Sequence, residues 1–147
     1  MTNGERIVEA AMPWLGTPHV NQARVKGIGV DCGMLLIGAL EDSRLVDKGT
    51  IQIQPYSNEW HLHHSEEWFL SYVKRYCCQV YELNKGDFMM FQFGRCISHA
   101  GIYIGNNILI HAVIGQGVIL SDLSDVMFLD SHGKSRLRGI YRFKGVK

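Results

Sequence analysis

The sequence predicts an α+β fold in which N-terminal helices pack on an antiparallel β-sheet. Apolar residues recur at helical spacing in the first half of the 147-residue chain. Short β-rich segments, separated by Gly, Asn, Asp and Ser, fill the second half. Helices followed by strands are typical of this fold class. No internal repeat or linker interrupts the pattern, so we expect residues 1–147 to form one domain.

Three helices are expected in the first half. Residues 3–15 carry apolar side chains at helical spacing, with Pro13 late in the segment, where it would tighten or end the helix. Asp31 is a good N-cap for an apolar helix over residues 32–42. A third helix is expected over about residues 63–77.

The remaining segments are predicted loops and strands. Residues 16–29 contain Gly and Pro without a periodic pattern and indicate a long loop, and residues 44–60 look irregular. The basic tail, residues 134–147, alternates charged with apolar side chains, which favours a solvated edge strand. The strand segments are CQVYEL, DFMMFQF, HAGIYIG, ILIHAVI, GVIL and GIYRFK.

Composition excludes several classes of function. The net charge of +1 argues against a dedicated nucleic-acid binder, which usually carries a strong basic excess. No apolar run reaches the ~18 residues of a membrane span, and no secretory signal is visible, so we expect synthesis in the cytoplasm. Four irregularly spaced cysteines are too few for a disulfide scaffold and are expected to be mostly reduced.

Two histidines fall on one face of a predicted hairpin, SHAGIYIGNNILIHAV. Matching the aliphatic faces of its strands fixes the register, because a one-residue slip would turn one strand inside out. With residues 105–107 as a three-residue loop, Gly101 pairs with His111, and His99 lies diagonally beside His111 on the same face. A two-residue loop would instead put the histidines on opposite faces.

A single cysteine stands where the long loop turns into the second helix. Cys32 follows the expected N-cap Asp31, and the partial positive charge of a helix N-terminus lowers the pKa of a thiol. Together the residues match the logic of a catalytic triad, with Cys32 as nucleophile, His99 as general base and His111 as orienter. The backbone N–H of Cys32 would be an oxyanion donor. The structural alternatives are a small buried thiol and hydrogen-bonded strand histidines.

At these motifs the chain resembles the NlpC-type, papain-like cell-wall cysteine peptidases. The matching segments, WLGTPHVNQARVKGIGVDCGMLL, KGDFMMF and SHAGIYIGNNILIHA, span most of residues 12–113. Two segments, HVNQARVKG and YSNEWHLHHSEE, make this chain most similar to the subgroup of the family found in phage tails and phage-like particles. The resemblance implies a papain-like fold, the same catalytic residues (Cys32, His99 and His111) and no metal or organic cofactor.

The resemblance also implies a substrate, partners and a location. It implies hydrolysis of an amide in the peptidoglycan stem peptide, often between γ-linked D-glutamate and a diamino acid. Phage-tail proteins would be further partners, and the virion or a phage-like particle the place of action. His19 stands where family members often have Tyr near the groove for the free amine of the substrate, and Gly33 where they often have Ser. Asp31 is open to two interpretations, a ligand for that ammonium or the helix cap alone.

Alternative functions stay open from the sequence. A tail-tip structural protein with the same fold would bind neighbouring subunits without turnover, and an acyltransferase would pass the acyl group to an amine or lipid. A zinc site at His61, His63 and His64 with Cys77 and Cys78 is disfavoured, because the spacing matches no paired-ligand pattern.

Overall fold

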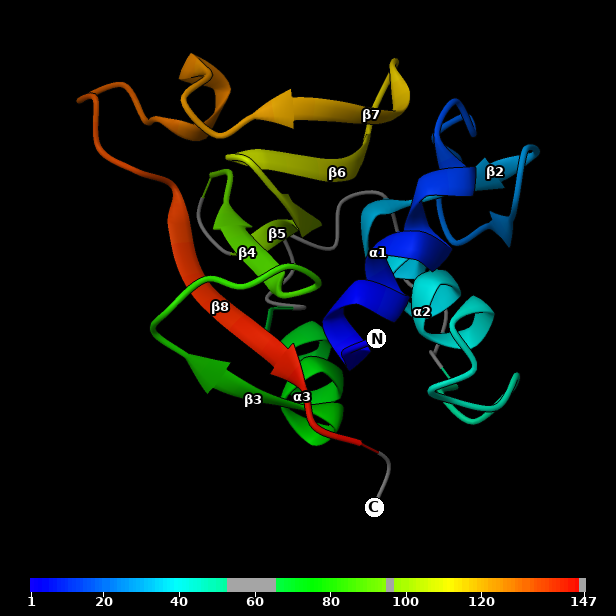
Figure 1. Ribbon diagram of the computed structural model, residues 1–147. Helices are drawn as coiled ribbons and strands as arrows, with labels where there is room; N and C mark the ends of the chain where they lie inside the picture. Colours follow the sequence, from blue (N-terminus) through cyan, green and yellow to red (C-terminus); the bar gives the residue numbers. More distant parts are fainter. Residues whose placement is uncertain (53–65, 95–96, 146–147) are drawn as a thin grey trace.

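Six antiparallel strands form the main sheet of the computed structural model, which describes residues 1–52, 66–94 and 97–145, without the side chains of residues 66–70 (Figure 1). This arrangement confirms the predicted α+β class. The strands lie in the order β3 (Cys77–Val80), β8 (Leu137–Phe143), β4 (Phe88–Gln92), β5 (Ile97–Gly105), β6 (Ile108–Val113) and β7 (Gly117–Asp122).

The helices begin and end close to the predicted positions. Helix α1 (Asn3–Ala11) gives way to a 3₁₀ turn over Met12–Trp14, in keeping with the effect expected of Pro13. Helix α2 (Cys32–Asp42) has the predicted bounds. Helix α3 (Glu66–Tyr76) lies inside the predicted range, whose first residues fall outside the described part of the chain.

The predicted long loop contains a small hairpin. Strands β1 (Arg24–Val25) and β2 (Gly29–Val30) pair antiparallel and form a second, two-stranded sheet just before α2. Each strand has only two residues, too short for a period-two pattern to be recognised. The interpretation of residues 16–29 as a loop without secondary structure is therefore wrong at these positions.

Strand β8 is an interior strand, so the prediction of a solvated edge strand in the basic tail is wrong. It pairs with β3 on one side and with β4 on the other, and Figure 1 shows it between them. Tyr141 and Phe143 are buried. The charge of Arg142 is matched by the buried carboxylate of Asp87 at 2.8 Å. A charged residue in an interior strand is accommodated here because its partner comes from the start of β4.

The turn between β5 and β6 is shorter than predicted. Asn106 and Asn107, with φ of 54° and 64°, form a two-residue turn, and Gly105 pairs with Ile108. A register shift between Tyr103 and Gly105 adds one residue to β5. The rest of β5 and β6 therefore pairs in the predicted register, with Tyr103 opposite Leu109. The expectation that a two-residue loop would place the histidines on opposite faces is wrong, because it left out this bulge.

Apolar side chains cover both faces of the central strands. The main core packs α1 and α2 against one face of the sheet, with Phe88 and Met90 of β4 pointing into it. Met89 and Phe91 join a second cluster on the other face, which includes Phe128 from the connection between β7 and β8. Burial on both faces explains the unbroken apolar run FMMF, which would be unusual in an antiparallel strand with one solvated face.

None of the helices that the structure describes is long and apolar enough to cross a membrane.

Candidate active site

The start of α2 is held by the side chain of Asp31. Its Oδ1 accepts a hydrogen bond from the backbone N–H of Met34 at 2.9 Å, which confirms the predicted N-cap. Its Oδ2 accepts a second bond from the backbone N–H of Gln22 at 2.7 Å. Only 4% of Asp31 is exposed. The carboxylate therefore ties the preceding loop to the helix end, and its role toward a substrate ammonium stays a prediction.

The thiol of Cys32 lies against the strand that carries His99. Cys32 is the first residue of α2 and is buried. Its Sγ lies 3.9 Å from the carbonyl oxygen of Ser98, the residue before His99, and the backbone N–H of Ala100, the residue after it, also faces the sulfur. The fold thus brings the helix N-terminus to the position in β5 that the sequence analysis singled out.

Burial raises the pKa of the Cys32 thiol, which the helix N-terminus was expected to lower. Burial raises this pKa to about 12, with the neighbouring Asp31 charge acting in the same direction. Hydrogen bonds from the backbone N–H groups of Ala100, Gly33 and Cys32 lower the pKa, but by less. The expectation of a thiol with a lowered pKa is therefore wrong for the free protein, because loss of solvent outweighs the helix N-terminus. The resting thiol is neutral.

A chain of hydrogen bonds links three strands behind the thiol. His99 Nε2 lies 2.7 Å from His111 Nδ1, so the predicted pair on β5 and β6 meets as expected. His111 Nε2 in turn lies 2.8 Å from the hydroxyl of Ser121 on β7. With Nε2 of His99 occupied, its Nδ1 is the ring nitrogen left for another partner. This arrangement can hold one imidazole in place while that nitrogen accepts a proton.

Aromatic rings enclose the histidine pair. The ring of His99 lies edge-on to Phe93, with centroids 5.3 Å apart, and Phe128 lies 5.7 Å from His111. Burial lowers the pKa of His99 to about 3, helped by charge interactions with His111 and then His19. Burial also lowers the pKa of His111, which is 0% exposed, to about 4. Both imidazoles are therefore neutral at pH 7, and Nδ1 of His99 is the nitrogen that can act as a base.

His19 enters the site through the segment before the small hairpin. It forms an isolated parallel bridge with Val30, two residues before Cys32, and is half-buried. After burial and the charge of His111, its own charge further lowers the pKa of His99. The bridge places His19 against the strand that leads into α2, and its contact with substrate stays a prediction.

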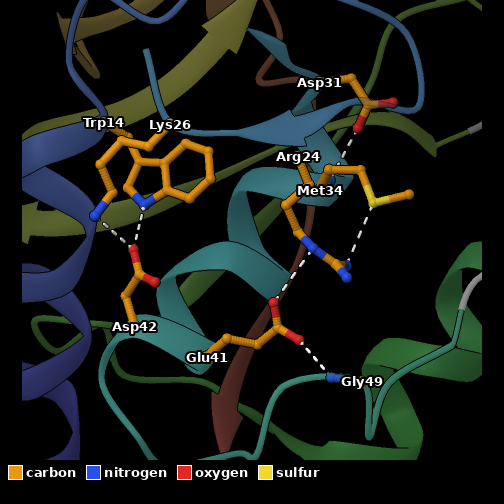
Figure 2. Close-up of polar contacts among 8 residues, drawn as sticks. All are labelled: Trp14, Arg24, Lys26, Asp31, Met34, Glu41, Asp42 and Gly49. Carbon is orange, nitrogen blue, oxygen red and sulfur yellow. Dashed lines mark hydrogen bonds and ion pairs between the residues drawn. The ribbon is translucent and has the colours of Figure 1, made fainter. Parts of the chain in front are cut away.

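The β1–β2 hairpin is fastened to the far end of α2 (Figure 2). Arg24 Nε lies 3.3 Å from Glu41 Oε1, and Lys26 Nζ lies 2.8 Å from Asp42 Oδ2. The indole of Trp14 donates to the same Asp42 oxygen at 3.0 Å. These contacts fix the hairpin at the end of α2 away from the thiol, while the Asp31–Gln22 bond fixes the loop before it at the other end.

Several of the candidate zinc ligands lie beyond the part of the chain that the structure describes. His61, His63, His64 and Cys96 lie outside it, so the disfavoured zinc interpretation stays untested there. Among residues 1–52, 66–94 and 97–145, no group of three His, Cys, Asp or Glu is arranged to hold a metal ion. Cys32, Cys77 and Cys78 are free thiols, as expected.

Ser121 is not among the site residues predicted from the sequence. Its position could have been found from the β6–β7 turn, because pairing Val113 with Gly117 puts Ile119 opposite His111 and Ser121 two residues further along the same face. The alternation of side chains along β7 would have identified Ser121, but only if the length of the β6–β7 turn had been known.

A protein-family model and two relatives match parts of this chain. The model of the NlpC/P60 family matches residues 16–136. The "Probable endopeptidase NlpC homolog" of Haemophilus influenzae is 44% identical over 55 residues, which are 37% of this chain and 28% of the relative. The "Murein DD-endopeptidase MepS/Murein LD-carboxypeptidase" of Escherichia coli K12 is 37% identical over 54 residues, 37% of this chain and 29% of the relative. The aligned segments thus span under a third of either relative.

Solved structures share the fold. NlpC1 from Trichomonas vaginalis superposes with a TM-score of 0.64 at 20% identity, covering 95% of this chain and 44% of that one. The NlpC/p60 domain of the peptidoglycan hydrolase SagA superposes with a TM-score of 0.60 at 17% identity, covering 97% of this chain and 100% of that one. These neighbours confirm the predicted papain-like architecture.

Proposed function

The chain belongs to the NlpC/P60 family, and from this we propose that it is a cysteine peptidase or amidase that hydrolyses amide bonds in peptidoglycan stem peptides. One relative is named a probable endopeptidase and another a murein DD-endopeptidase and murein LD-carboxypeptidase, and one structural neighbour is the domain of a peptidoglycan hydrolase. The observation that carries the proposal is the position of Cys32. It begins α2 with its sulfur against the strand of His99, whose Nε2 is bonded to His111.

In the proposed reaction His99 acts first as base and then as acid. As Cys32 Sγ attacks the amide carbonyl, the thiol proton passes to His99 Nδ1, and the new oxyanion accepts a hydrogen bond from the backbone N–H of Cys32. The imidazolium then gives its proton to the leaving amine, and the C–N bond breaks to leave a thioester. Water attacks the thioester with His99 again as base, and the acid product leaves as the thiol is reprotonated.

The raised pKa of Cys32 affects when the thiol proton is transferred to His99. Because burial keeps the thiol and the imidazole neutral in the free protein, proton transfer accompanies attack instead of preceding it. His111 holds the Nε2 side of His99, so Nδ1 is directed away from β6. His111 thereby acts as the orienter in the triad.

We assign substrate contacts to His19 and Asp31. His19 forms a backbone bridge with Val30, two residues before Cys32, so we expect it to reach a chain bound across the thiol. The charge of Asp31, next to Cys32, would attract the free amine of a stem peptide even while the carboxylate caps α2. The bond between γ-linked D-glutamate and the diamino acid is the proposed site of cleavage.

The decisive experiment compares purified variants on isolated muropeptides. Cys32→Ala and His99→Ala are expected to lose at least ~10³-fold in kcat/KM, whereas Cys78→Ala, which removes an exposed thiol, should retain activity. Mass spectrometry of the products identifies the bond, because cleavage after D-glutamate leaves a new free amine on the diamino acid. Full activity in Cys32→Ala would refute the proposal.

We further propose that the protein acts as part of a phage tail or phage-like particle, after synthesis in the cytoplasm. The support is the sequence similarity of HVNQARVKG and YSNEWHLHHSEE to that subgroup. Mass spectrometry of particles purified from the producing cells should detect this chain at a constant ratio to tail proteins. Its absence from such particles, with the chain abundant in the cells, would contradict this location.

A further inference from the structure

Ser121 is the last member of the hydrogen-bonded chain that begins at His99. Strands β6 and β7 pair without a bulge from Ile108 with Asp122 to Val113 with Gly117. This register places Ser121 diagonally across from His111, at the spacing where side chains on one sheet face meet. The 2.8 Å contact between its hydroxyl and His111 Nε2 therefore follows from the strand pairing.

The proton on each imidazole nitrogen determines whether His99 can work as a base. A neutral imidazole carries one proton, and the nitrogen without it is the acceptor. For Nδ1 of His99 to accept the thiol proton, the His99 proton must lie on Nε2 and point at His111 Nδ1. His111 then carries its own proton on Nε2 and donates it to Ser121 Oγ.

The opposite arrangement is unproductive. If Ser121 donated to His111 Nε2, the proton of His111 would lie on Nδ1 and be donated to His99 Nε2. His99 would then carry its proton on Nδ1 and could not act as the base. Protonating His99 in this arrangement would also set two N–H groups against each other across the 2.7 Å contact. When Ser121 accepts a hydrogen bond from His111, every contact keeps one donor and one acceptor, whether His99 is neutral or protonated.

We propose that Ser121 is a positioning residue that, by accepting a hydrogen bond from His111, selects the proton arrangement in which His99 is a base. This inference rests on the proposed function, in which His99 takes the thiol proton. Ser121 does not touch the reacting atoms and acts through His111. Removing its hydroxyl should therefore lower kcat with little change in KM.

An isosteric pair of variants isolates the hydroxyl. Ser121→Thr keeps it and Ser121→Val replaces it with a methyl group, and both β-branched residues suit a strand. Ser121→Ala is a second variant without the hydroxyl and adds no atoms. Ser124→Ala is the matched control, because Ser124 is exposed and its hydroxyl bonds to Asn107 and not to a histidine.

The primary readout is the position of the imidazole protons, measured by ¹⁵N NMR at pH 7 without substrate. In the wild type, Ser121→Thr and Ser124→Ala, both histidines should carry the proton on Nε2. In Ser121→Val and Ser121→Ala the population with the proton on Nδ1 should rise, and kcat should fall about five- to tenfold.

Equal proton positions and equal kcat in the Thr and Val variants would overturn the assignment. So would a loss of activity in Ser121→Thr that matches that of Ser121→Val. The proposed function is tested separately, because retained hydrolysis in Cys32→Ala would refute it. The NMR comparison would still show whether Ser121 orients the histidines.

Discussion

His99 Nε2 and His111 Nδ1 meet at 2.7 Å, although the two residues are twelve positions apart in the chain. The contact occupies Nε2 of His99, and no hydrogen bond to its Nδ1 is found among the residues that the structure describes. His111 is completely buried and is held on its far side by Ser121. His111 is therefore held on both sides and shielded from water, which favours its neutral form.

The first prediction concerns alkylation of the thiols. Burial raises the pKa of Cys32 to about 12, so iodoacetamide should label it slowly at pH 6 in the free protein, and more slowly than the exposed Cys78. Peptide mapping after timed labelling measures both rates in one sample, with Cys32→Ala as the control. Rapid labelling of Cys32 at pH 6 that depends on His99 would show instead a resting thiolate–imidazolium pair.

The second prediction concerns the pH dependence of hydrolysis. The reactive form has a neutral thiol and a neutral His99, and it persists between the pKa of His99, about 3, and that of Cys32, about 12. We therefore expect kcat/KM to be nearly flat from about pH 5 to 9, with loss only as acid protonates His99. Circular dichroism at each pH checks that the protein stays folded. A half-maximal rate near pH 6.5 would contradict the prediction.

The third prediction concerns stability in acid. The pKa of His111 is about 4 in the folded protein and 6.5 when unperturbed, so the unfolded chain binds more protons between these values. Stability is complete above pH 6.5 and falls as the pH drops toward 4. His111 should contribute on the order of 3 kcal/mol to this loss.

Urea unfolding of the wild type and of His111→Gln, which cannot titrate, measures that contribution. The free energy of unfolding of the wild type should fall more between pH 7 and 4 than that of the variant. Parallel pH profiles for the two proteins would rule out His111 as a source of acid sensitivity.

The fourth prediction concerns two glycines with the same backbone conformation. Gly86 and Gly94 have φ of 89° and 91°, so alanine costs about 1 kcal/mol of backbone strain at either position. A Cβ on Gly86 would also lie 2.5 Å from the carbonyl oxygen of Gly4, whereas no described atom lies within 4 Å of one on Gly94. Gly86→Ala should therefore be roughly 2 kcal/mol less stable than Gly94→Ala.

Thermal or urea unfolding of both variants provides the comparison, and Gly94→Ala serves as the control for strain alone. Equal losses of stability would mean that the backbone of α1 shifts away from Gly86 at little cost.

Features set by local physics were predictable. The cap at Asp31 and the bounds of α2 depend on neighbouring residues, and the structure confirms them. The contact between His99 and His111 depends on the alternation of side chains along two adjacent strands. The turn is one residue shorter than predicted, but the bulge before Gly105 adds one residue, so the strands pair in the predicted register. In each case the relevant partners lie within a few residues or within one hairpin.

Features set by distant pairing were not predictable. The interior position of β8 follows from pairing with β3, more than fifty residues earlier in the chain, and from the bond between Arg142 and Asp87. Nothing in the local alternation of the tail distinguishes such a strand from a solvated edge. Ser121 was missed for a different reason: it lies in the same hairpin as His111, but its place diagonally across from that residue depends on the length of the β6–β7 turn.

The sequence by itself determined where the candidate catalytic residues lie: a cysteine at a capped helix N-terminus and two histidines on one hairpin face. The tertiary structure decided their protonation. A helix N-terminus lowers the pKa of a thiol locally, but the desolvation that raises the pKa of Cys32 is produced by packing α2 against the sheet. Burial is a property of the whole fold, so the charge state of the site could be determined only once the chain was folded.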